Sequence, residues 1–196
     1  VLLKKLGVGG KLLYFGTVIS YLSVYNFIVR PTSMATIYPF FLLLLISLLS
    51  HKRLFIIAAA LTFYIYAYLW QLAILVILLY CFIVKFERKF LLILLLAIPA
   101  LFYLNLQINS PYYWETMRLI GLVETRLPTV ASFYYAFWSL FALLPAIIVT
   151  NKKFRSFFII ISISFLILLF SNVITGKELE TANHVGRFVL LAGSIA

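Results

Sequence analysis

Residues 54 to 84 read LFIIAAALTFYIYAYLWQLAILVILLYCFIV, the longest stretch of the chain without a charged side chain. As a single helix this stretch would extend roughly 46 Å, because an α-helix rises about 1.5 Å per residue. The hydrocarbon core of a bilayer is only about 30 Å thick. The stretch is therefore too long for one ordinary membrane span and short for two, and its interpretation sets the side of the membrane for every later segment.

Hydrophobic residues make up 65% of the chain and charged residues only 11%. Soluble globular domains carry about 25% charged residues, so this composition indicates a membrane protein. Inside a bilayer every backbone polar group must be bonded within the protein, which leaves helices or a closed barrel. Barrel strands alternate apolar and polar residues, and the long apolar runs do not. We therefore expect an all-α fold, a polytopic transmembrane helical bundle.

The rest of the chain contains five further apolar segments: Leu12 to Val29, Ile37 to Leu49, Phe90 to Leu106, Thr129 to Val149 and Phe157 to Val173. A last run starts at Phe188 and stops about ten residues later, whereas a span needs roughly twenty apolar residues. We expect about seven or eight spans including this incomplete one. We expect these spans to form a single transmembrane domain over residues 1–196, and we expect this domain to be a fragment of a longer membrane protein.

The positive-inside rule discriminates between one span and two for residues 54 to 84, because it expects lysine and arginine on the cytoplasmic side. A hairpin places eleven of the 16 lysines and arginines on that side, and a single helix places only nine there. The rule therefore favours a hairpin that turns near Tyr68 to Gln71. Turn chemistry opposes it, since the segment holds neither glycine nor proline there. The tyrosines around Tyr68 fit an interfacial aromatic belt or plain packing.

The net charge of +11 does not indicate nucleic-acid binding, because the cations lie in short clusters between apolar runs. The single cysteine, Cys81, allows no disulfide and no cysteine-based metal site within the chain. The two histidines, His51 and His184, fall on opposite sides of the predicted membrane. We expect no metal site and no cofactor within this chain.

With the hairpin, the two longest connecting loops, residues 107–128 and 174–186, lie together on the extracytoplasmic side. Four of the five acidic residues belong to these loops: Glu115, Glu124, Glu178 and Glu180. The first loop starts with Ser110 and Pro111, a typical helix start, and places Glu115 and Arg118 where they can pair on one helical face. Gly121 shortens this surface helix, which is either a plain linker or a lid over a lipid groove.

The second loop carries the candidate chemistry. Arg187 stands at the start of an apolar run, where a guanidinium can bind a phosphate through two hydrogen bonds. His184 lies one helical turn earlier and is expected to face the same site. The candidate catalytic residues are His184, Glu178 and Glu180, and the candidate lipid-phosphate ligands are Arg187 and Arg118. In the competing interpretation, Arg187 snorkels to lipid headgroups and His184 caps the helix.

The run from His184 to Leu191, HVGRFVLL, resembles the His-Lys-Glu-x-Arg-Phe segment of some GT-C glycosyltransferases. The likeness covers about eight residues and maps only His184 and Arg187 onto the motif. The likeness implies a multi-span enzyme that takes sugars from polyprenol-phosphate carriers on the outer face of the membrane. The His to Arg spacing is one residue shorter here, and the Lys-Glu pair is absent. The chain also contains no aspartate. The resemblance therefore implies that the acidic pair usual in the family would have to lie upstream of Val1, and a divalent metal would be held there only if such residues exist.

The expected function is therefore transfer of a sugar from a lipid-phosphate donor at the extracytoplasmic face. The expected partners are membrane lipids, a polyprenol-phosphate-sugar and other membrane subunits, with no nucleic acid. A non-catalytic helical subunit or scaffold of a membrane complex is the main alternative, because polar residues are scarce within the spans. A transporter is a further alternative, for which only Pro99 and Pro145 offer a broken span.

Overall fold

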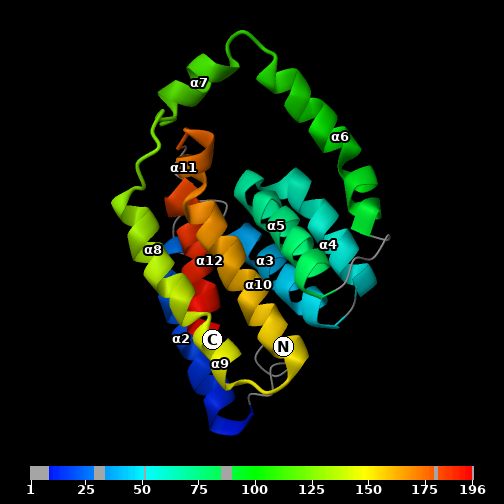
Figure 1. The fold of residues 1–196 in the computed structure, drawn as a ribbon, viewed down its shortest axis with the longest axis vertical. Helices are drawn as coiled ribbons and strands as arrows, with labels where there is room; N and C mark the ends of the chain where they lie inside the picture. Colours follow the sequence, from blue (N-terminus) through cyan, green and yellow to red (C-terminus); the bar gives the residue numbers. More distant parts are fainter. Residues whose placement is uncertain (1–8, 29–33, 51, 85–89, 179–180, 196) are drawn as a thin grey trace.

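The computed structural model describes residues 9–28, 34–50, 52–84, 90–178 and 181–195 (Figure 1). Within these ranges the secondary structure is helical, with no strands, which confirms the all-α prediction. The helices are α2 (Gly10–Ile28), α3 (Met34–Ser50), α4 (Lys52–Ile65), α5 (Ala67–Ile83), α6 (Leu91–Ile108), α7 (Tyr113–Leu119), α8 (Val130–Phe141), α9 (Leu144–Ile148), α10 (Lys152–Leu169), α11 (Ser171–Thr175) and α12 (Thr181–Ile195).

One helical run in the described part of the chain, Val130–Ile148, is both long enough and apolar enough to cross a membrane. It combines α8 and α9. Shorter apolar helices occur at Gly10–Ile19, Ile37–Leu49, Leu54–Ile65, Tyr68–Ile83 and Leu95–Ile108. The expected number of seven or eight spans therefore remains a prediction.

Residues 54 to 84 form a helical hairpin. The ring of Phe90 contacts both Phe55, near the start of α4, and Tyr80, near the end of α5, with centroid separations of 6.1 and 5.6 Å. In a continuous helix, residues 55 and 80 would lie roughly 38 Å apart. The structure thus confirms the two-helix interpretation of this segment.

The hairpin turns at Tyr66 rather than at the predicted Tyr68 to Gln71. Tyr66 adopts an extended conformation (φ −160°, ψ 124°), and its carbonyl accepts hydrogen bonds from the amides of Leu69 and Trp70. The Trp70 ring stacks on Phe63 across the turn, with centroids 5.2 Å apart. One extended residue and an aromatic stack reverse the chain without glycine or proline, so the turn chemistry that opposed a hairpin was a misleading signal.

Helix α12 packs closely against α8 because two glycines face it (Figure 1). A Cβ atom at Gly186 would overlap the ring of Tyr135, and one at Gly193 would lie 3.3 Å from the carbonyl oxygen of Trp138. Small residues allow helix backbones to approach in this way. In the core, the buried ring of Phe41 on α3 contacts the ring of Phe188 on α12, so α3 also packs against α12.

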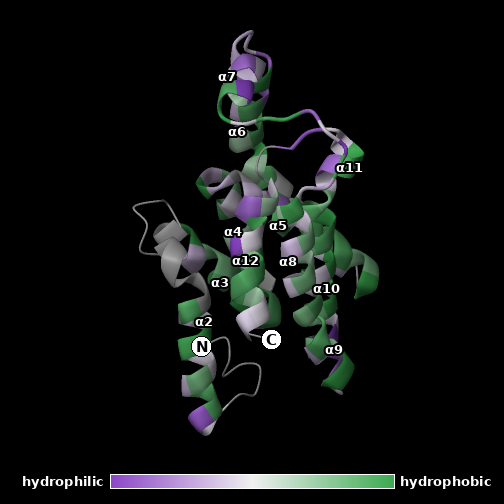
Figure 2. Cartoon of the chain, turned by 90° about the vertical axis from the view of Figure 1, so that its left-hand side faces the viewer, coloured by the Kyte–Doolittle hydropathy of each residue, from purple (hydrophilic) through white to green (hydrophobic). Residues whose placement is uncertain are grey.

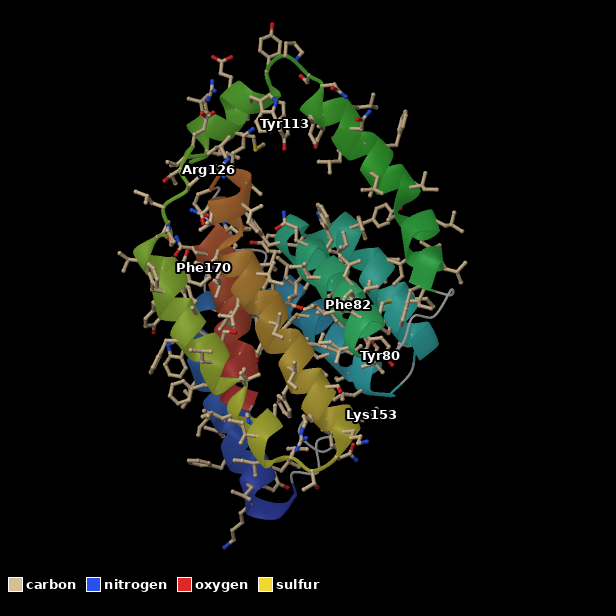
Figure 3. The ribbon with its side chains drawn as sticks, in the orientation of Figure 1. Tyr80, Phe82, Tyr113, Arg126, Lys153 and Phe170 are labelled. Atoms are coloured by element: carbon tan, nitrogen blue, oxygen red, sulfur yellow. The ribbon has the colours of Figure 1, made fainter. Side chains whose placement is uncertain are left out.

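The two predicted outer loops contact each other at one end of the bundle. The Arg126 guanidinium donates to the carbonyl of Val173 at 3.2 Å, and the Asn172 amide donates to the carbonyl of Leu127 at 2.8 Å. Val123 and Glu178 exchange two backbone hydrogen bonds of 2.8 Å each. In Figure 3 the label of Arg126 marks the end of the bundle where these loops meet, and the label of Lys153 lies near the opposite end.

Candidate functional site

The candidate site surrounds His184 and Arg187 in the first two turns of α12. Tyrosines from three other parts of the fold complete it: Tyr38 of α3, Tyr66 of the α4–α5 turn and Tyr135 of α8. We refer to these five residues as the His-Arg cluster. The cluster therefore joins segments that are far apart in the sequence.

The imidazole of His184 is held by two tyrosines of the hairpin. The Tyr66 hydroxyl is hydrogen-bonded to its Nδ1, and the Tyr68 ring stacks on it with centroids 4.5 Å apart and an interplanar angle of 7°. When the hydroxyl donates, Nδ1 is the acceptor and the ring proton resides on Nε2. The hydrogen bond and the stacked Tyr68 ring thus fix the orientation of the imidazole.

Arg187 follows His184 by one helical turn and is half-buried. It directly precedes Phe188, whose ring contacts the rings of Tyr38 and Tyr66. The Tyr38 hydroxyl also donates to the Arg187 carbonyl oxygen at 3.5 Å. Tyr66 bonds His184 and packs against Phe188, so the first two turns of α12 meet the hairpin turn, and a shared site of His184 and Arg187 stays a prediction.

An aromatic floor supports the cluster. The buried ring of Phe188 meets Tyr38 edge-on at 6.1 Å and Tyr66 at 6.3 Å, and Phe41 lies 4.9 Å behind it. Aromatic pairs prefer such inclined arrangements. The contacts restrict the rotamers of Tyr38 and Tyr66, so both hydroxyls are held in place before any ligand binds.

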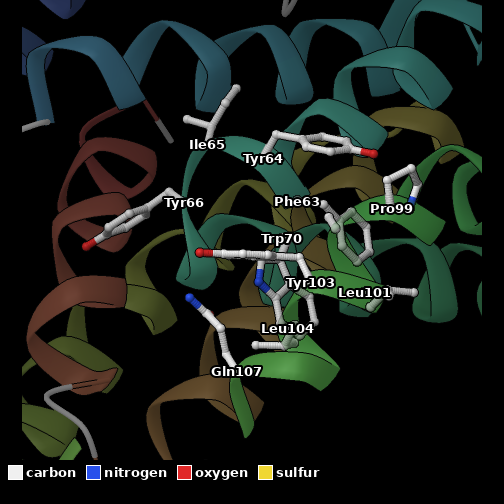
Figure 4. Close-up of a pocket in the computed structure, with 11 residues that line it drawn as sticks. Phe63, Tyr64, Ile65, Tyr66, Trp70, Pro99, Leu101, Tyr103, Leu104 and Gln107 are labelled. Atoms are coloured by element: carbon white, nitrogen blue, oxygen red, sulfur yellow. The ribbon is translucent and has the colours of Figure 1, made fainter. Parts of the chain in front are cut away.

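A cavity of about 560 Å³ adjoins the cluster at Tyr66 (Figure 4). One wall is the hairpin tip, with Phe63, Tyr64 and Trp70, and the other is α6. The residues of α6 that line it are Pro99, Ala100, Leu101, Tyr103, Leu104 and Gln107. Its walls are mainly aromatic and aliphatic, which suits an apolar chain, and Tyr66 links it to His184.

Glu178, expected to be catalytic, has a structural role in this geometry. Its side chain is 6% exposed, and Oε1 accepts a hydrogen bond from the Ala182 amide at 3.2 Å. That bond satisfies an amide in the first turn of α12, as a capping group does. Glu178 therefore acts as a capping group for α12, whereas the His184 ring is bonded to Tyr66. Glu180 lies outside the described residues.

Arg118, the second expected phosphate ligand, lies apart from Arg187. It belongs to α7, which stands away from α12 in two perpendicular views (Figures 1 and 2). Its guanidinium pairs with Glu124 at 3.1 Å instead of with Glu115, so the predicted pairing is wrong. The chain reverses at Gly121, with φ 106°, directly after α7, and this turn brings Glu124 back toward Arg118.

The tyrosines of the cluster were largely missed at the sequence level. Tyr66 and Tyr68 were noted only as aromatic neighbours, and Tyr38 and Tyr135 fall within apolar runs where nothing marks them as polar partners. The one available signal is Gly186, because a glycine inside an apolar helix indicates close approach of another element. That element is the ring of Tyr135.

In the described part of the chain, no three histidine, cysteine or acidic side chains gather closely enough to hold a metal ion. His51 lies outside the described residues. Comparisons with protein-family models, with curated proteins and with solved structures found no match.

Proposed function

We propose that this chain is part of a multi-pass membrane protein that binds a polyprenol-phosphate-linked sugar and transfers the sugar at the extracytoplasmic face. The observation that carries the proposal is the His-Arg cluster, placed beside an apolar cavity at the loop-bearing end of the bundle. The cluster offers hydrogen-bond donors and a positive charge to a phosphate. The cavity offers an apolar wall to an isoprenoid chain.

Membrane insertion is supported by the apolar side chains on the outside of the bundle. Phe82 of α5 is 94% exposed, and Val130 of α8 and Ile148 of α9 are exposed to a similar degree. Figure 2 shows hydrophobic residues along most of the helices, whereas α7 and the segments beside α11 carry hydrophilic residues. Soluble proteins rarely expose contiguous apolar surface on this scale, and lipid would cover it.

Helix length supports several crossings. Helices α2, α3, α5, α6 and α10 have 17 to 19 residues, which corresponds to roughly 26 to 29 Å of rise. That rise approaches the hydrocarbon thickness of about 30 Å. Helix α4 has only 14 residues, so its junction with α5 at Tyr66 lies within the membrane or at its outer boundary.

Non-helical backbone at membrane depth is tolerated where protein buries it or where it lines a cavity. The extended residue Tyr66 meets that condition, since it lines the cavity and bonds His184. Tyr66 is thus both the turn residue between α4 and α5 and part of the wall of the cavity that we assign to the isoprenoid chain.

In the proposed reaction, an acceptor hydroxyl forms a bond to the anomeric carbon of the sugar as the bond from that carbon to the phosphate breaks. Arg187 neutralises the charge that grows on the departing phosphate. Nε2 of His184 donates to a phosphate oxygen, held in that orientation by Tyr66. The acceptor proton passes to a carboxylate on this side, for which Glu180 is the candidate, because the Glu178 carboxylate caps α12.

The test is Arg187→Ala in the full-length protein, with Arg155→Ala at the opposite end of the bundle as the matched control. We expect the first variant to lose at least a hundredfold of polyprenol-phosphate-sugar turnover, the size of loss seen when one transition-state donor is removed. The control should keep its turnover, and both should insert into membranes. Unchanged turnover in Arg187→Ala would contradict the proposed role of Arg187 in neutralising the departing phosphate.

A non-catalytic subunit of a membrane complex remains the second candidate. The observation that favours it is Glu178, whose carboxylate is engaged as a helix cap. In this case Arg187 and the tyrosines would stabilise the bundle and nothing more. An inactive wild-type protein that co-purifies with other membrane subunits would support this function over sugar transfer.

A further inference from the structure

A second cavity, of about 450 Å³, lies at the end of the bundle opposite the outer loops. We call it the basic-end cavity. Its walls are the ends of α3 and α5 and the beginning of α10, contributed by Leu48, Leu49, Tyr80, Ile83, Val84, Phe157 and Ile160. The interior is therefore apolar, and no residue of the His-Arg cluster borders it.

The rim of this cavity is cationic. Lys152 and Lys153 line it together with Ser156, and neither lysine forms an ion pair with a described residue. Both lysines occupy the first turn of α10, an 18-residue helix that Asn151 caps through a 2.9 Å bond to the Lys153 amide. The helix dipole places further positive potential at the same point, so cations there are unfavourable unless an anion joins them.

The two halves of the cavity restrict the ligand. A free anion would gain nothing from the apolar walls, and a neutral lipid would gain nothing from the lysines. We propose that the basic-end cavity binds an anionic phospholipid. The phosphate contacts Lys152, Lys153 and the Ser156 hydroxyl, and one acyl chain lies along Leu49, Ile83 and Ile160.

This site rests on the membrane placement proposed above and is independent of sugar transfer. Anionic lipids are concentrated in the cytoplasmic leaflet, and basic residues at a membrane surface bind them. The lysines of the rim belong to the end of the bundle that the positive-inside rule assigns to the cytoplasm. The ligand and its leaflet are thus consistent with one orientation of the chain.

The experiment compares lipid retention by native mass spectrometry. Purified full-length protein is loaded with equal amounts of phosphatidylglycerol and phosphatidylcholine that carry the same acyl chains. The wild type should retain phosphatidylglycerol preferentially. Lys152→Gln with Lys153→Gln should reduce that preference about twenty-five-fold, since each lysine near an anionic surface contributes roughly a factor of five. Lys177→Gln, at the other end of the bundle, serves as the charge control.

A second pair of variants tests the apolar half of the site. Ile83→Trp places a larger side chain in the cavity and should reduce retention of both lipids. Phe82→Trp changes the neighbouring exposed residue, which does not line the cavity, and should leave retention unchanged. Ile83 is itself 42% exposed, so the bulkier side chain can be accommodated without unfolding the bundle.

Equal retention of the two lipids, or full preference in the double lysine variant, would overturn the proposal. Displacement of phosphatidylglycerol by inorganic phosphate would also overturn it, because it would indicate a free-anion site. Flotation of the protein with vesicles of either lipid tests separately whether the protein binds membranes at all. A protein that does not float contradicts the membrane proposal itself, whereas a floating protein without lipid preference contradicts only the anionic-lipid site.

Discussion

Helices α7 and α12 both lie next to charged loops on the same end of the molecule, yet they differ in how the fold uses them. Helix α7 has no buried residue, whereas α12 buries most of its side chains against α8, α2 and α10. Both carry an arginine that the sequence marks as a phosphate ligand. Only Arg187, on α12, has become part of a cluster of polar side chains from several helices.

The difference follows from the residues that surround each arginine. Gly186 lets α12 approach α8 so closely that the Tyr135 ring occupies the place of a side chain. In α7 the seven-residue helix ends just before Gly121 and contacts the rest through single interactions, such as Lys177 over the Trp114 ring at 3.6 Å. Charge indicates which side of a membrane a segment occupies, but packing decides whether it contributes to a site.

Of the two substitutions that compare α12 with α7, Gly186→Ala should have the larger effect on stability and turnover. The added methyl group would overlap the Tyr135 ring, and overpacking of this kind costs about 1–3 kcal/mol. We expect a lower thermal unfolding temperature in detergent and reduced turnover, because the helix must move away from Tyr135. The matched control is Gly9→Ala, where an added Cβ meets no atom of a described residue within 4 Å. Equal stability of the two variants would show that the contact between α8 and α12 is looser than described.

A much smaller effect is expected from Arg118→Gln on α7. The pair with Glu124 is exposed on both sides, and such surface pairs contribute about 0–1 kcal/mol. Unfolding temperature should change little, and turnover should be kept. A loss of turnover as large as that of Arg187→Ala would contradict the difference between the two helices, because it would show that Arg118 contributes to the site.

The fold was predictable from the sequence where apolar length decides it. The apolar runs became helices, and the distribution of lysine and arginine correctly favoured two helices between Leu54 and Val84. The position of the turn could not be predicted, because it depends on Trp70 stacking on Phe63 and on the extended backbone of Tyr66. The start of α12 at Thr181 was also missed, since the capping oxygen of Glu178 lies in a polar stretch without apolar periodicity.

The candidate site was predictable only in part. The spacing of His184 and Arg187 places them one turn apart on a helix, and in the structure His184 bonds Tyr66 while the Arg187 carbonyl accepts from Tyr38. The tyrosine partners come from α3, α8 and the hairpin tip, and no local pattern pairs residues so distant in sequence. Arg118 and Glu178 were grouped with them on charge alone, which does not distinguish an exposed ion pair or a helix cap from a ligand.

The most direct test of the account is the sidedness of the two ends of the bundle. Single cysteines at Lys177 and Lys153 are introduced into full-length protein in which Cys81 is replaced by serine, and intact cells are treated with a membrane-impermeant thiol reagent. We expect Lys177→Cys to be labelled in intact cells and Lys153→Cys to be labelled only after permeabilisation. Labelling of both positions from the same side would contradict this expectation.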